Sequence, residues 1–203
     1  DYEPELNALK TAVRKFNPEF PVIATESGFR SMTAFPDFAR IPDFARFQAA
    51  GSVRLLLIGL ANGLEQFYLF SFSFRDQGTG YITTLMGGPD NGFHPLPSPT
   101  LFAVRGMIDR IYGAKPVRRI PLGNDCRCYL FDRGDVRVAA LWKWSGEPVT
   151  IEPGTAWRNG RLYDLFGNVL NPEKFQLSAS PCYFETTLSA DALAEKIASL
   201  PLL

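Results

Sequence analysis

Residues 21–28 read Pro21-Val22-Ile23-Ala24-Thr25-Glu26-Ser27-Gly28. An apolar run that enters through a proline and ends abruptly on a carboxylate predicts a short buried strand over residues 21–25. Glu26 would then stand at the C-terminal end of a rigid element, and Gly28 would let the chain turn sharply away. The carboxyl ends of parallel strands carry the catalytic groups of α/β barrels. Glu26 is therefore the first candidate catalytic residue, although a lone glutamate there could also merely cap the next turn.

Outward from this stretch, predicted helices and strands alternate as far as residue 116. Helical periodicity and capping residues predict helices over residues 4–16, 43–65 and 98–112, and an apolar run predicts a second buried strand over 67–74. The alternation favours parallel strands joined by crossover helices. Residues 1–116 are thus predicted to form the strand-and-helix part of an α/β domain.

After residue 116 the pattern changes to short strands and turns. Residues 126–132 and 136–144 are predicted to be strands joined by a hairpin-length turn, and the alternation in 136–144 predicts a half-buried strand. Further short strands separated by glycine- and proline-marked turns are predicted up to Thr187, followed by a helix over 190–200. Residues 117–203 are therefore predicted to form an antiparallel β-sandwich domain with a short C-terminal helix.

Composition excludes several partners. The 203 residues carry 21 basic and 21 acidic side chains, so the chain does not resemble a nucleic-acid-binding protein. No apolar stretch is long enough for a transmembrane segment, and nothing indicates a cofactor. Cys126, Cys128 and Cys182 are interpreted as buried thiols, and a disulfide from Cys182 to either of the others stays open if the protein is exported. A metal site is not expected, because His94 is the only histidine and lies far along the chain from the cysteines.

The order of these elements resembles the last quarter of a clan-A glycoside hydrolase. The matching features are the strand ending on Glu26, a buried helix, the strand over 67–74, the loop His94-Pro95-Leu96-Pro97 entering a helix, and the later antiparallel strands. The layout is most similar to xylosidase-like and exopolysaccharide-degrading members. The resemblance implies a fold of two kinds, α/β plus all-β: strands seven and eight of a (β/α)8 TIM barrel over 1–116, and a β-sandwich over 117–203.

The resemblance also implies an activity, the hydrolysis of O-glycosidic bonds in an oligo- or polysaccharide with retention of configuration. Glu26 matches the position of the nucleophile. The proton donor of this clan follows an asparagine at the end of strand four, and this sequence contains no Asn-Glu pair. An N-terminal barrel segment, covalent or on a separate chain, is therefore expected to supply it.

Seven further residues are candidate contacts for the sugar because they lie at or after the ends of the two expected strands: Phe29, Arg30, Phe74, Arg75, Asp76, Tyr81 and His94. The aromatic rings could stack on a sugar ring or pack in a core. The arginines could bind hydroxyl groups or form surface ion pairs. Asp76 could bind a hydroxyl or replace the missing acid, but it could also form a turn. His94 could face the site or only shape its loop.

Two other classes of function stay open. The missing proton donor and the many aromatic residues also fit a non-catalytic carbohydrate-binding module, and a structural fragment that stabilises another chain is the third alternative. A secreted or periplasmic location is favoured if a signal peptide lies upstream. The sequence does not determine the sugar or the linkage.

Overall fold

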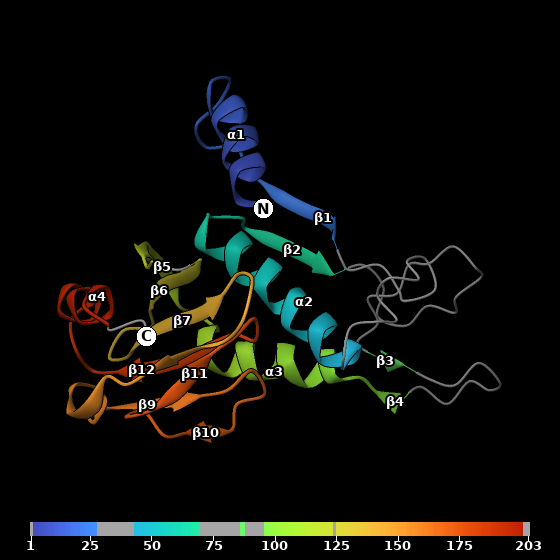
Figure 1. The fold of residues 1–203 in the computed structure, drawn as a ribbon. Helices are drawn as coiled ribbons and strands as arrows, with labels where there is room; N and C mark the ends of the chain where they lie inside the picture. Colours follow the sequence, from blue (N-terminus) through green and yellow to red (C-terminus); the bar gives the residue numbers. More distant parts are fainter. Residues whose placement is uncertain (1, 28–42, 70–85, 88–95, 124, 201–203) are drawn as a thin grey trace. The chain divides into compact units, whose positions relative to one another are not determined.

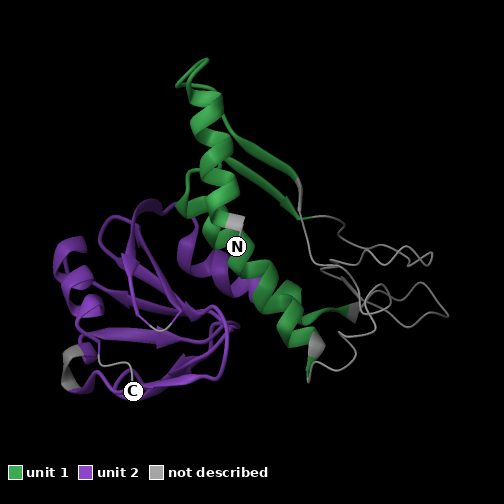
Figure 2. Ribbon diagram, turned by 45° about the horizontal axis from the view of Figure 1, so that its top comes forward, with its two compact units in different colours: residues 1–102 green, residues 103–203 purple. Residues whose placement is uncertain are grey.

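The structure is a computed structural model that describes residues 2–27, 43–69, 86–87, 96–123 and 125–200 (Figure 1). The chain divides into two compact units, residues 1–102 and residues 103–203 (Figure 2). This division precedes the boundary at residue 116 that the sequence predicted between barrel and sandwich. That domain boundary stays a prediction, and the two units are described separately below.

Unit 1 contains helices and short strands in alternation. Its elements are α1 (Tyr2–Arg14), β1 (Ile23–Ser27), α2 (Phe44–Ala61), β2 (Gln66–Leu69), β3 (Met86–Gly87), β4 (Leu96–Pro97) and the first turn of α3 (Pro99–Ile111). β1 and β2 pair in parallel, with α2 between them in the chain, which confirms the predicted parallel pairing (Figure 1). β3 and β4 pair antiparallel. Residues 70–74 of the second predicted strand lie outside the described residues.

The β1–β2 pair is covered less than the sequence predicted. Ile23 is 45% exposed and Tyr68 is 53% exposed, although both belong to runs that were expected to be buried. On the other side of the pair, a Cβ added at Gly59 of α2 would lie 3.0 Å from Cδ2 of Phe67, so this face contacts the helix. Two strands can be covered on one face by a single helix, and the opposite face then stays open.

Polar groups attach α1 to the C-terminal end of α2. Lys10 donates to the main-chain oxygen of Asn62, the C-cap residue of α2, where a cation interacts favourably with the helix dipole. Asn62 in turn donates to a carboxylate oxygen of Glu3 at 3.3 Å. Leu6 is buried beside these groups, whereas Phe16, the last residue of the helix predicted over 4–16, lies beyond the end of α1 and is exposed.

Unit 2 is built from antiparallel strands. After the rest of α3 it contains β5 (Lys115–Pro121), β6 (Cys126–Asp132), β7 (Arg137–Lys143), β8 (Val149–Ile151), a 3-10 helix (Gly154–Trp157), β9 (Gly160–Tyr163), β10 (Val169–Leu170), β11 (Phe175–Leu177), β12 (Cys182–Thr186) and α4 (Ala190–Ala198). Six strands form one sheet in the order β10-β9-β12-β7-β6-β5, and β8 pairs with β11 in a second, two-stranded sheet. Every strand pairing described in this unit is antiparallel, as predicted.

β5, the edge strand of the large sheet, was not predicted from the sequence. Its sequence, Lys-Pro-Val-Arg-Arg-Ile-Pro, contains two prolines and three basic residues and lacks the apolar alternation of a typical strand. Charged residues and prolines are characteristic of edge strands, because they prevent pairing with another chain. Arg118 of this strand forms an ion pair with Asp191 of α4 at 2.7 Å.

The main core lies on one face of the six-stranded sheet. Opposite this face lie the β8–β11 pair, the 3-10 helix and α4, which contribute buried side chains that include Ile151, Trp157, Phe175, Leu193 and Ile197. The predicted half-buried character of residues 136–144 was wrong, because both faces of β7 are buried from Val138 to Trp142. β7 is an interior strand, and its second face carries its own apolar layer, in which Trp142 stacks on Tyr129 with ring centroids 5.4 Å apart.

Candidate functional site

Glu26 is the next-to-last residue of β1, which ends at Ser27. Because β1 and β2 are parallel, their carboxyl ends lie at the same edge of the pair. Glu26 is therefore at the edge where an α/β barrel carries its catalytic groups. The sequence predicted a strand over 21–25 that ends before Glu26, whereas the observed strand starts two residues later and includes Glu26.

The pairing of the two strands is irregular where Glu26 stands. Ala24 is opposite Phe67 and Ser27 is opposite Leu69, so two residues of β1, Thr25 and Glu26, correspond to the single residue Tyr68 of β2. Two residues opposite one is the pattern of a β-bulge. Bulges are uncommon between parallel strands and frequent next to active sites. Sequence reasoning did not predict it, because a bulge depends on the partner strand.

The seven candidate sugar contacts lie outside the described residues: Phe29, Arg30, Phe74, Arg75, Asp76, Tyr81 and His94. Their roles stay predictions. Of the candidate site, the structure describes the strand pair, the backbone of Glu26 and the irregularity in β1.

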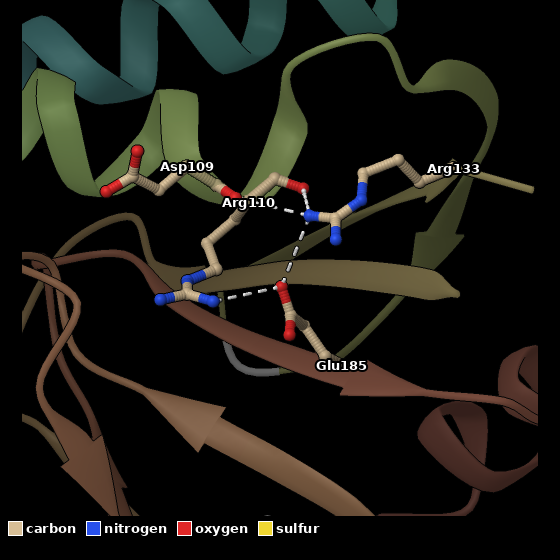
Figure 3. Close-up of polar contacts among 4 residues, drawn as sticks. All are labelled: Asp109, Arg110, Arg133 and Glu185. Carbon is tan, nitrogen blue, oxygen red and sulfur yellow. Dashed lines mark hydrogen bonds and ion pairs between the residues drawn. The ribbon is translucent and has the colours of Figure 1, made fainter. Parts of the chain in front are cut away.

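A second polar cluster, in unit 2, was not singled out from the sequence. Arg110 of α3 and Arg133 of the β6–β7 turn both approach the Oε1 atom of Glu185 on β12, at 3.4 Å and 3.6 Å (Figure 3). Arg133 also donates to the main-chain oxygens of Asp109 and Arg110, at the C-terminal end of α3. The Arg110 guanidinium lies 3.8 Å from the centroid of the Tyr163 ring. These contacts attach α3 to the sheet. The feature of the sequence that could have indicated them is a glutamate within the largely apolar strand Cys-Tyr-Phe-Glu-Thr.

The three cysteines are buried thiols, and none forms a disulfide. Burial raises the pKa of the Cys182 thiol to about 12, and burial also raises the pKa values of Cys126 and Cys128. Such thiols are poor nucleophiles and poor metal ligands, because both roles need the thiolate. The described residues contain no group of three or more His, Cys, Asp or Glu side chains that could hold a metal ion.

Comparison with solved structures places this fold among the glycoside hydrolases. A family 39 glycoside hydrolase from the gut symbiont Bacteroides cellulosilyticus WH2 matches 82% of the chain with a TM-score of 0.56 and 18% sequence identity. A GH30 endoxylanase from Clostridium papyrosolvens C71 matches 86% of the chain with a TM-score of 0.51 and 13% identity. The expected resemblance to clan-A glycoside hydrolases is confirmed for the fold. The chain has the mixed α/β fold with antiparallel sheets found in the C-terminal part of these enzymes.

The match covers only part of each enzyme. The chain corresponds to 34% of the length of the Bacteroides protein and to 44% of the Clostridium protein. No family model and no curated protein matches the sequence. Within the described residues, no helix is both long and apolar enough to cross a lipid bilayer.

Proposed function

We propose that this chain is the C-terminal portion of a retaining glycoside hydrolase in which Glu26 is the nucleophile. The observation that carries the proposal is the place of Glu26 at the carboxyl end of β1, beside the parallel strand β2, in a fold shared with glycoside hydrolases. Clan-A barrels carry catalytic carboxylates at strand ends of this kind. The substrate is an oligo- or polysaccharide.

The chemistry requires a second carboxyl group. In retaining hydrolysis one carboxylate attacks the anomeric carbon while another, about 5–5.5 Å away, protonates the leaving oxygen and later activates water. The proposed source of the second group is an N-terminal barrel segment, which would also bring strands to the β1–β2 pair. The exposed side chains of Ile23 and Tyr68 support this part of the proposal, because further barrel strands would extend the pair and help enclose its open face.

The test is a pair of substitutions in the full-length enzyme. Glu26→Gln keeps the size of the side chain and removes its charge, so the protein should fold while glycosyl-enzyme formation fails. Glu26→Ala should also be inactive on an aryl glycoside. Added azide should restore turnover of the Ala variant, because a small anion can enter the vacated space, and the azide product should have inverted configuration.

One outcome would reject Glu26 as the nucleophile. If Glu26→Gln keeps more than about a tenth of the wild-type rate, the loss is below about 1.4 kcal/mol and too small for a nucleophile. The non-catalytic carbohydrate-binding or structural module then becomes the better interpretation. Binding of oligosaccharides without hydrolysis would distinguish these two.

A further inference from the structure

Helix α1 turns only part of its apolar stripe toward α2. Its buried side carries Leu6 and two charged residues, Glu3 and Lys10. With about 3.6 residues per turn, both charged residues lie about 40–60° to one side of Leu6. Leu9 lies about 60° to the other side, and it is 54% exposed. A helix of a globular protein normally turns the centre of its apolar stripe toward a core. The contact with α2 therefore uses one margin of the stripe and leaves its centre uncovered.

The uncovered side of α1 continues toward β1. Phe16 follows Leu9 by nearly two helical turns, and the hydrogen bond from its amide to the Val13 oxygen extends the turn past the end of α1. Phe16 therefore lies on the same side as Leu9, and it is 89% exposed. Phe20 and Ile23 follow on the way into β1 and are 57% and 45% exposed. Large apolar side chains gathered in one exposed stretch are typical of an interaction surface. Leu9, Phe16, Phe20 and Ile23 are called the α1 surface below.

Two observations favour an occupant from the rest of a longer enzyme over a second copy of this chain. The chain corresponds to only 34% and 44% of the lengths of two glycoside hydrolases that share its fold. The α1 surface also runs into β1, to which the proposed N-terminal barrel segment would add strands. A second copy would gain little, because stable interfaces bury about 1,200–2,000 Å² in total and the row from Leu9 to Phe16 is only about 10 Å long.

We propose that the α1 surface is the docking site of the N-terminal barrel segment, and that an amphipathic helix of that segment covers Leu9 and Phe16. The proposal rests on the proposed function and names the surface that holds the segment carrying the proton donor. A helix suits this row, because ridges of side chains spaced three and four residues apart pack into the grooves of a neighbouring helix. Helix α1 is then covered on two sides, by α2 at the charged margin of its stripe and by the added helix at the centre.

The experiment introduces single cysteines into the full-length enzyme. Leu9→Cys and Phe16→Cys report on the α1 surface, and Thr11→Cys is the matched control, because Thr11 is exposed on the opposite side of the same helix. The native thiols are buried, so a thiol reagent reports the introduced cysteine. Leu9→Cys and Phe16→Cys should react at least about tenfold more slowly than Thr11→Cys, because the reaction requires access of the reagent to the sulfur.

Two results would overturn the proposal. Reaction of Leu9→Cys and Phe16→Cys at the rate of Thr11→Cys would show that the α1 surface is open to solvent. Protection that disappears on dilution of the protein would assign the surface to a second copy. The nucleophile is tested separately: an open α1 surface together with an inactive Glu26→Gln variant rejects the docking site alone. A protected α1 surface together with an active Glu26→Gln variant rejects the nucleophile alone.

A measurement on the unaltered full-length enzyme covers the case in which a cysteine variant does not fold. Hydroxyl radicals oxidise an exposed phenyl ring faster than an exposed valine side chain. Phe16 should nevertheless be oxidised more slowly than Val169 of β10, which is 71% exposed. Faster oxidation of Phe16 than of Val169 would place the ring in solvent, and the proposal would fail.

Discussion

The thiols of Cys128 and Cys182 show how single residues acquire their chemistry from the sheet. Both residues are opposite Leu141, one on each side of β7. Two strand spacings separate them by about 9.5 Å, which exceeds the roughly 7 Å limit for a disulfide. Cys126 is two pairs further along, opposite Lys143, and is no better placed to reach Cys182. The disulfide that the sequence left open is therefore incompatible with this sheet.

The native protein should not react with thiol reagents at pH 8. Burial raises the pKa of Cys182 to about 12 and shifts the other two thiols in the same direction, so almost no thiolate forms, and the sulfur atoms are also shielded from reagent. Titration with a chromogenic disulfide should detect three thiols in denaturant and none on the same timescale without it. Rapid modification of even one thiol in the folded protein would contradict this environment.

Between elements, the Glu185 carboxylate is the group on which two arginines converge. Its side chain is 14% exposed, and it faces Arg110 from α3 and Arg133 from the β6–β7 turn. Arg133 also satisfies carbonyl groups at the C-terminal end of α3, where a cation is favourable. The cluster therefore joins a helix, a turn and an interior strand of unit 2.

Glu185→Ala should destabilise unit 2 by about 1–3 kcal/mol, because two partly buried guanidinium groups lose their shared acceptor. Urea unfolding followed by tryptophan fluorescence measures this selectively, since all three tryptophans, Trp142, Trp144 and Trp157, belong to unit 2. The matched control is Arg105→Ala. It breaks the Arg105–Asp109 pair, whose side chains are 74% and 46% exposed, and should cost less than about 0.5 kcal/mol. If both substitutions lower the free energy of unfolding by the same amount, the cluster stabilises unit 2 no more than an exposed ion pair does.

At the scale of the whole molecule, we proposed that Glu26 is the nucleophile and that an N-terminal barrel segment supplies the proton donor. This proposal predicts that these 203 residues alone are almost inactive. Attack by Glu26 without protonation of the leaving group should lose roughly 10²–10⁴-fold from acid catalysis alone. The purified chain should therefore show no more than trace hydrolysis of xylo-oligosaccharides and other oligosaccharides with unactivated leaving groups. Sustained turnover by the chain would point to an acid within it, and Asp76 would be the first residue to substitute.

Much of unit 2 could be predicted from sequence. The strand over 126–132 was predicted with its observed bounds, and the strand predicted over 136–144 differs from β7 by one residue at each end. The helix predicted over 190–200 begins at Ala190 as expected, and the side chain of Ser189 caps it by accepting a hydrogen bond from the Ala192 amide. Turn residues and side-chain alternation act within a few residues, so the chain specifies them locally.

The position of Glu26 at a strand end and the parallel pairing of β1 with β2 could also be inferred from the amino-acid sequence, because buried strands separated by a long helix favour a crossover connection. The sequence did not indicate that Thr25 and Glu26 share one partner, that both faces of β7 are buried, or that two arginines meet at Glu185. Each of these depends on a neighbour distant along the chain. Register and burial depend on the free energy of contacts between elements, and only the tertiary structure determines which contacts form.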